Sequence, residues 1–142
     1  MRTIDAGMDE YVNATAPDIL GSGGLGPCIS IGAIYGERGY MVHYIPLQRF
    51  DEVPCINEFF RALKMEAKDK SKLKIYVAGG QIVSEQEDED KILEYLVQGR
   101  QTVLDKITEQ GYKIGGLRWC PVGVGQVLTL NLSKGRAIYE EF

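Results

Sequence analysis

The sequence contains few of the side chains on which most catalytic and metal sites depend. It has a single histidine, His43, so any imidazole chemistry must use that residue. Its three cysteines, Cys28, Cys55 and Cys120, are widely spaced and form no CxxC pair. This pattern is typical of a reduced protein rather than a disulfide scaffold. One histidine and scattered cysteines also give no recognisable spacing for a metal site.

The chain also lacks the segments that mark membrane, secreted and nucleic-acid-binding proteins. No apolar run approaches the roughly 18 residues that a membrane span requires. The first seven residues contain no apolar region of the kind found in a signal peptide. The formal net charge is −4, and no basic block stands out that would favour nucleic acid. We therefore expect a cytoplasmic protein that neither inserts into a membrane nor binds nucleic acid.

The composition that remains is that of one ordinary globular domain. Hydrophobic residues make up 44% of the 142 residues and charged residues 25%, which is close to the average usage of folded domains. A chain of this length can bury a substantial core as one unit. We find no internal repeat and no long linker, so we expect a single domain over residues 1–142.

The spacing of apolar residues changes along the chain from strand-like to helical and back. Pro54 suits the first turn of a helix, Gly99 is the point where the second helix could break, and Gly111 suits its end. The acidic run at 85–90 suits a helix N-terminus. The order of elements predicts an α+β fold, with mixed β-sheets packed against two main helices. We predict strands over 8–15, 28–35, 40–45 and 73–78, helices over 54–68 and 88–109, and a hairpin over 126–132 and 136–139.

Cys28 is the first candidate for chemistry because it follows the glycine-rich run 21–27 and begins a predicted strand. A thiol needs a nearby base to become a good nucleophile, and histidine is the usual one. One interpretation is a Cys28 thiolate activated by His43, with N–H groups of the glycine-rich turn forming an oxyanion hole. The alternative is a small buried apolar residue at the start of a core strand, which is where free cysteine usually lies.

The predicted hairpin brings Cys28 and His43 to the same end of two strands but leaves them out of register. With the turn centred between Glu37 and Arg38, Cys28 would lie opposite residue 47. His43 would then be offset by about four residues, or roughly 13 Å along an extended strand. Contact would require a bulge, or a cysteine that has left the strand.

Three further residues have both a structural and a functional interpretation. Ser22 is either a turn residue or the hydrogen-bond partner of one imidazole nitrogen, which fixes the tautomer as the third member of a triad does. Cys55 lies in the first turn of a predicted helix, where the dipole lowers a thiol pKa, although a partly buried helix residue is the commoner case. Cys120 follows Trp119 in a loop-like segment and, like Cys55, could in principle be a nucleophile.

These residues lie in stretches that resemble the chemoreceptor glutamine deamidase family, CheD. The cysteine stretch resembles the family signature T-x-G-L-G-S-C-V, and the histidine stretch resembles the family strand that ends near a proline. The other two stretches resemble the opening strand and a later strand with paired glycines, and the final hairpin also fits. In chain order the four stretches are Gly7-Met8-Asp9-Glu10-Tyr11, Ser22-Gly23-Gly24-Leu25-Gly26-Pro27-Cys28-Ile29, Met41-Val42-His43-Tyr44-Ile45-Pro46 and Val77-Ala78-Gly79-Gly80.

The resemblance implies an activity, a site and partners. Cys28 would be the nucleophile, His43 the general base, and Ser22 would take the place of the family threonine. The reaction would be that of a protein-glutamine glutaminase, which converts glutamine side chains to glutamate and releases ammonia without a metal or cofactor. The substrates would be chemoreceptor helices in chemotaxis, a CheC-type phosphatase would be a partner, and the fold would be a layered sandwich.

Three departures from the family pattern keep other functions open. Pro27 replaces the serine before the cysteine and has no N–H to donate near an oxyanion. Ser22 keeps the hydroxyl of threonine but loses the methyl group that restricts its χ1 angle. The loop 121–126 lacks the arginines that the family tends to show after its glycines. The alternatives are a CheD-like binding module with weak catalysis, which would dock the phosphatase or a receptor, and a cysteine protease.

Overall fold

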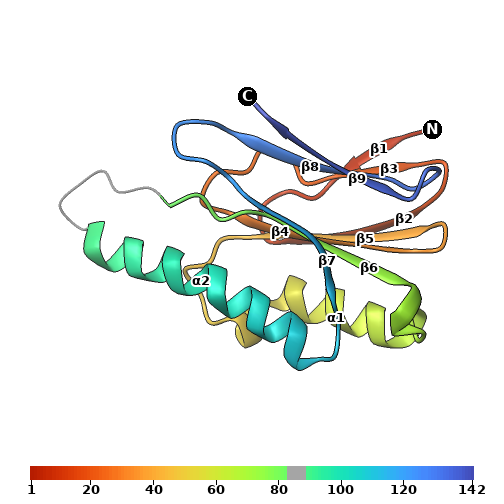
Figure 1. Ribbon diagram of the computed structural model, residues 1–142, viewed down its shortest axis with the longest axis horizontal. Helices are drawn as coiled ribbons and strands as arrows, with labels where there is room; N and C mark the ends of the chain where they lie inside the picture. The colour runs from red at the N-terminus through yellow and green to blue at the C-terminus, as the bar shows by residue number, and fades with distance from the viewer. Residues whose placement is uncertain (83–88) are drawn as a thin grey trace.

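The computed structural model describes residues 1–82 and 89–142, which are arranged in three layers (Figure 1). Two β-sheets lie face to face, and two helices cover the outer face of one sheet, so the predicted α+β class is confirmed. The helices are α1 (Pro54–Glu66) and α2 (Glu89–Glu109), with 3-10 turns at Phe50–Glu52 and Lys70–Lys72. The strands are β1 (Thr3–Asp5), β2 (Glu10–Thr15), β3 (Ile19–Gly21), β4 (Ile29–Tyr35), β5 (Arg38–Tyr44), β6 (Leu73–Gly79), β7 (Ile114–Trp119), β8 (Gln126–Asn131) and β9 (Arg136–Glu141).

The central layer is a five-stranded sheet in the order β2-β5-β4-β6-β7. The strands β2, β5, β4 and β6 pair antiparallel, and β7 pairs parallel with β6 through the crossover helix α2. Strands β4 and β5 are buried on both faces. This explains their continuous apolar sequences, because only a strand on the surface of a core shows alternation.

The outer layer is a four-stranded sheet in the order β1-β3-β8-β9. Strands β1 and β3 are only three residues long and pair parallel, while β3, β8 and β9 pair antiparallel. The inward face of β8 supplies Leu128 and Leu130, which pack against Met41 and Ile34 of the central sheet. This inter-sheet core also contains Cys28.

Helix α1 covers the opposite face of the central sheet and begins at Pro54, as the sequence predicts. Its inward residues Ile56, Phe59 and Leu63 are almost completely buried. Each contributes about 1.5–3 kcal/mol by removal from water. The helix predicted over 88–109 is also confirmed, and it continues through Gly99 without a break. Most of the predicted acidic run at 85–90 lies outside the described residues.

Strands β1, β3 and β7 were not predicted. Two of them are too short to show alternation, and β7 contains the pair Gly115-Gly116, which lacks side chains that could mark a buried face. Within the described residues, neither helix combines the length and apolar character that a membrane span requires.

Candidate functional site

The β4–β5 hairpin sets the relation between Cys28 and His43, and its turn differs from the predicted one. Tyr35 pairs with Arg38, so the two turn residues are Gly36 and Glu37. Gly36 has φ 62°, which the first position of a type II′ turn requires. This moves the turn centre one residue toward the N-terminus, so the predicted centre between Glu37 and Arg38 is wrong.

The corrected register brings Cys28 two residues closer to His43 than predicted. Ser30 lies directly opposite His43, and Cys28 precedes Ser30 by two residues. Residues two apart in an extended chain point to the same face, and Cys28 packs in the inter-sheet core as Met41 of β5 does. Cys28 and His43 are therefore diagonal neighbours, for which Cα atoms are typically about 7–8 Å apart. The predicted offset of four residues is thus an offset of two.

The chain around Cys28 is held by the segment that follows β6. The N–H of Gly80 donates to the carbonyl of Cys28 at 2.8 Å, and the N–H of Gln81 donates to the carbonyl of Gly26 at 2.8 Å. Gly79 has φ 89°, and a Cβ atom there would overlap the Cys28 carbonyl oxygen. The paired glycines of the sequence are thus needed because the backbone passes this close to the cysteine.

The imidazole of His43 is held by backbone carbonyls of the other sheet. Its Nδ1 lies 2.7 Å from the carbonyl oxygen of Ser22 and 3.1 Å from that of Ala6. These residues directly follow β3 and β1, which run parallel, so both carbonyls arrive at the same place. A carbonyl only accepts hydrogen bonds, so we assign the proton to Nδ1. The other nitrogen, Nε2, is then the unprotonated one.

Ser22 acts on His43 through its main chain and not through its side chain. Its hydroxyl donates to the carbonyl of Gly23 at 2.7 Å and accepts the N–H of Leu128 at 2.9 Å. The predicted hydrogen bond between the Ser22 hydroxyl and the imidazole is therefore wrong. The side chain instead ties the Ser22 backbone to β8, which places the carbonyl that His43 uses.

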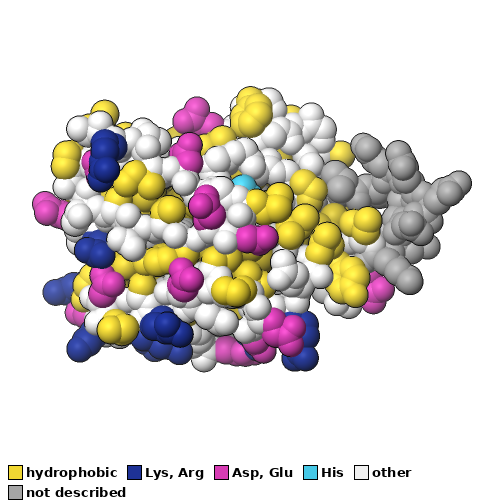
Figure 2. Space-filling view, turned by 180° about the vertical axis from the view of Figure 1, so that it is seen from behind, with side chains coloured by type: hydrophobic (Ala, Val, Ile, Leu, Met, Phe, Trp, Pro, Cys, Tyr) yellow, Lys and Arg dark blue, Asp and Glu magenta, His cyan; other side chains and the backbone are white. Residues whose placement is uncertain are grey.

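The Nε2 atom of His43 is buried and has no hydrogen-bond partner among the described residues. The histidine is 5% exposed and Cys28 is 7% exposed, and only a trace of cyan marks the histidine at the surface in Figure 2. Burial raises the pKa of the Cys28 thiol, and the negative charge of Asp9 raises it further. The raised pKa favours the neutral thiol, and Nε2, which has no partner among the described residues, lies on the same face of the sheet.

The backbone N–H of Cys28 is a candidate donor for an oxyanion. In the part of the chain that the structure describes, this N–H makes no backbone or side-chain hydrogen bond. The preceding residue, Pro27, has no N–H to add. The nucleophile's own N–H is one of the usual members of an oxyanion hole.

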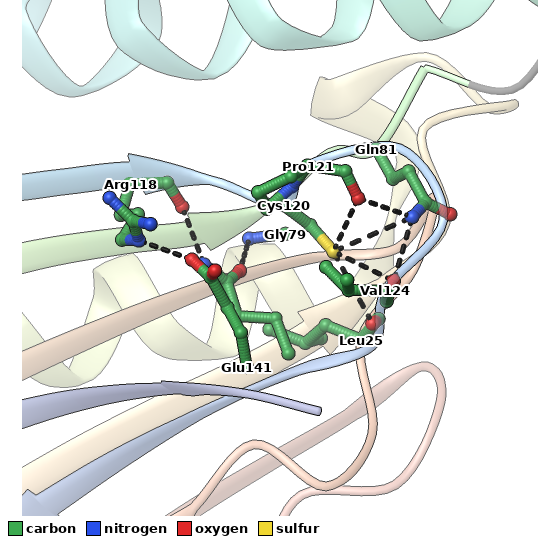
Figure 3. Close-up of polar contacts among 9 residues, drawn as sticks. Leu25, Gly79, Gln81, Arg118, Cys120, Pro121, Val124 and Glu141 are labelled. Carbon is green, nitrogen blue, oxygen red and sulfur yellow. Dashed lines mark hydrogen bonds and ion pairs between the residues drawn. The ribbon is translucent and has the colours of Figure 1, made fainter.

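A network of polar groups joins β6 and the segment after it to β7 and to the loop 120–125 (Figure 3). The side-chain NH₂ of Gln81 donates to the carbonyls of Pro121 and Val124, both at 2.7 Å. The completely buried Gln126 accepts the N–H of Gly79 at 2.7 Å and donates to the carbonyl of Arg118 at 3.1 Å. Sequence reasoning missed Gln81 and Gln126. The only sign of Gln81 in the sequence is its position after the paired glycines, and the only sign of Gln126 is that it is a polar residue at the start of an apolar strand.

Of the other two cysteines, Cys120 lies within this polar network, where its N–H donates to the carbonyl of Gly79 at 2.7 Å, and Cys55 lies in α1 on the opposite face of the central sheet. Cys120 is 1% exposed, and its Sγ lies 3.4 Å from the Val124 carbonyl. Cys55 is buried in the first turn of α1, and burial raises its pKa to about 11, opposite to the lowering that a helix dipole would cause. Both behave as buried core residues.

Two described cavities also lie elsewhere. One of about 380 Å³ lies between the segment 44–51 and α2, and one of about 680 Å³ lies between α1 and α2. Neither is lined by Cys28 or His43.

No protein-family model and no curated protein matches this chain.

Proposed function

We propose that this protein is a protein-glutamine deamidase of the CheD type, in which Cys28 is the nucleophile and His43 the general base. The observation that carries the proposal is the state of the imidazole. Two carbonyl acceptors hold the proton on Nδ1, so the buried Nε2, which bonds to none of the residues that the structure describes, can accept one. It lies on the face of the sheet that Cys28 shares.

The reaction follows from these groups. Cys28 Sγ attacks the carboxamide carbon of a glutamine side chain while Nε2 of His43 takes the thiol proton. The Cys28 N–H stabilises the negative oxygen of the tetrahedral intermediate. The C–N bond then breaks, and His43 returns the proton to the departing ammonia. Water attacks the resulting thioester, again losing a proton to His43, and glutamate leaves as the thiol is restored.

The resemblance to the CheD family supplies the substrate class. The targets would be glutamine side chains on chemoreceptor helices, and a CheC-type phosphatase would bind the protein in chemotaxis. The three cysteines are all free thiols in the structure, which suits the reducing cytoplasm where such receptors present their signalling helices.

Deamidation can be measured directly. The protein is incubated with candidate receptor fragments, and the mass of each glutamine-containing peptide and the ammonia released are followed. We expect a mass increase of about 1 Da with equimolar ammonia, which is the balance of amide hydrolysis. Cys28→Ala should abolish both signals. Undiminished activity in Cys28→Ala, or no activity of the native protein on good candidates, would rule the proposal out.

A second candidate function is a binding module with weak catalysis, and one observation favours it. Burial raises the pKa of Cys28, which lowers the fraction of reactive thiolate at neutral pH. The rate of thiol alkylation distinguishes the two functions. Under the enzyme proposal Cys28 reacts at pH 7 several times faster than Cys120, the buried control thiol of the same chain. Equal rates would favour the binding module.

A further inference from the structure

Ser30 is a second buried polar residue beside His43 that the proposed mechanism has not used. It lies in β4 directly opposite His43 in β5. Directly opposite residues have Cβ atoms about 4.5–5.5 Å apart and point to the same face. The Ser30 and His43 side chains therefore lie side by side, two residues along β4 from Cys28.

The Ser30 hydroxyl is buried without a hydrogen-bond partner among the described residues, as is Nε2 of His43. Ser30 is completely buried, and the pairing of β4 with both β5 and β6 places it in the interior of the sheet. A buried polar atom without a partner costs about 1–3 kcal/mol. Two such atoms beside each other, next to a candidate nucleophile, point to a shared polar molecule that both would bind during the reaction.

The two groups have complementary hydrogen-bonding capacity. Since Nδ1 carries the proton, Nε2 can only accept a hydrogen bond, whereas a serine hydroxyl can both donate and accept. A water molecule between them would accept from the Ser30 hydroxyl and donate to Nε2. Its proton would then point at the base, and a lone pair of its oxygen would be left for attack.

We propose that Ser30 is the positioning residue for the hydrolytic water. This inference rests on the proposed function, because it concerns the second half of that reaction. The water oxygen, held by Ser30 and His43, attacks the thioester carbon of acyl-Cys28 as its proton moves to Nε2. The carbon–sulfur bond breaks, the imidazolium returns the proton to Cys28 Sγ, and the carboxylic acid leaves.

Hydrolysis of acyl-Cys28 can be measured without a protein substrate. p-Nitrophenyl acetate acetylates a reactive thiol and releases nitrophenolate, and peptide mass spectrometry then follows the loss of the acetyl group from Cys28. We expect Ser30→Ala to acetylate within about twofold of the native rate but to deacylate about tenfold more slowly, because only the water step uses the hydroxyl. Ser30→Thr retains a hydroxyl and should restore most of the deacylation rate.

Stability provides an independent readout. Removing an unpartnered buried hydroxyl relieves its desolvation cost, so Ser30→Ala should unfold at an equal or higher urea concentration than the native protein. Ser133→Ala, in the exposed turn between β8 and β9, is the control that should change neither rate. Native deacylation in Ser30→Ala would overturn the inference, and so would an equal slowing of acylation and deacylation. Ser30-dependent deacylation without deamidation of any glutamine would overturn the proposed function and leave this inference standing.

Discussion

The imidazole of His43 is oriented by neutral carbonyl oxygens rather than by a carboxylate. Carbonyls fix the tautomer and the ring plane, but they stabilise the charged imidazolium less than an aspartate would. This arrangement suits a base that accepts a proton during attack and returns it in the same step. It does not suit a permanent thiolate–imidazolium pair, and the raised pKa of Cys28 agrees with that.

A substitution at Ser22 distinguishes the role of its side-chain hydroxyl from that of its main-chain carbonyl. In Ser22→Ala the N–H of Leu128, which now donates to the Ser22 hydroxyl, loses its partner. We expect the free energy of unfolding to fall by about 1–3 kcal/mol, and deamidation to fall less than in any His43 variant. Urea denaturation and activity measure the two effects. Ser22→Thr keeps the hydroxyl and is the matched control. An equal loss of stability in Ser22→Ala and Ser22→Thr would contradict the assigned hydrogen bond.

Asp9 is the charged residue that most directly affects the Cys28 thiol. It is exposed, its N–H donates to the His43 carbonyl at 2.7 Å, and it has φ 60°, a backbone conformation that asparagine also tolerates. Asp9→Asn should lower the pKa of Cys28, because a negative charge no longer opposes the thiolate. The rate of iodoacetamide alkylation against pH measures this pKa.

The control for Asp9→Asn is Glu37→Gln, which removes an exposed carboxylate at the far end of the hairpin, about 25 Å along the strand. The pH profile of Glu37→Gln should match the native one. An unshifted profile in Asp9→Asn would show that its charge does not reach the thiol.

At the scale of elements, the site depends on the ends of strands from both sheets. The residues that directly follow β1 and β3 supply the two carbonyls, β5 supplies the imidazole, and the segment after β6 holds the cysteine loop. The side chain of Gln126 connects the last residue of β6, Gly79, to Arg118 of β7. Its position explains why a polar side chain begins a strand whose inward residues are otherwise apolar.

Gln126→Leu would leave the N–H of Gly79 and the carbonyl of Arg118 without the side-chain partner that each now has. We expect a loss of about 1–3 kcal/mol in the free energy of unfolding, together with faster alkylation of Cys28 as the loop loosens. Urea denaturation and peptide mass spectrometry measure these effects. Gln101→Ala, on the exposed face of α2, should change stability by less than about 0.5 kcal/mol. Equal stability of both variants would refute this role.

How much of this could be predicted depends on whether a feature lies in side chains or in the backbone. The apolar spacing of Ile56, Phe59 and Leu63 reports α1 directly, and the continuous run of β4 reports a buried strand. The register of the β4–β5 hairpin also depends on the type of its turn, which involves the positive φ of Gly36. The glycines at 36 and 39 are compatible with several turn types, so the sequence did not fix this register. The carbonyls that hold His43 could not be predicted, because any residue has a carbonyl and only the parallel β1–β3 pair brings these two together.

At the scale of the whole molecule, thiols and phenols are buried in two cores, one between the two sheets and one between the central sheet and the helices. Burial raises the pKa of Cys55 to about 11, and that of Tyr40 and Tyr139 each to about 12. Each group is neutral in the folded chain at pH values where the unfolded chain would ionise it. Folding is thus linked to proton binding in the alkaline range.

Stability should therefore fall as pH rises. Below the ordinary thiol pKa of 9.0, the Cys55 thiol is protonated in both the folded and the unfolded chain, and its contribution to the free energy of unfolding is fully present. Between pH 9 and 11 the unfolded chain releases the Cys55 proton and the folded chain keeps it, so this thiol lowers the free energy of unfolding by up to about 1.4 kcal/mol per pH unit. Urea denaturation across this range measures the slope. Cys55→Ala should reduce the slope by about one proton, and an unchanged slope would contradict the burial of this thiol.

We assign Nε2 of His43 as the base for Cys28. The most direct test is the rate at which iodoacetamide alkylates Cys28 at pH 7.5 in the native protein and in His43→Asn. Asparagine can keep an N–H donor near the position of Nδ1, directed at the carbonyls of Ser22 and Ala6, while it removes the base. Urea denaturation confirms that the variant folds. We predict that alkylation slows about tenfold or more, and a rate within about twofold of the native value would contradict the claim.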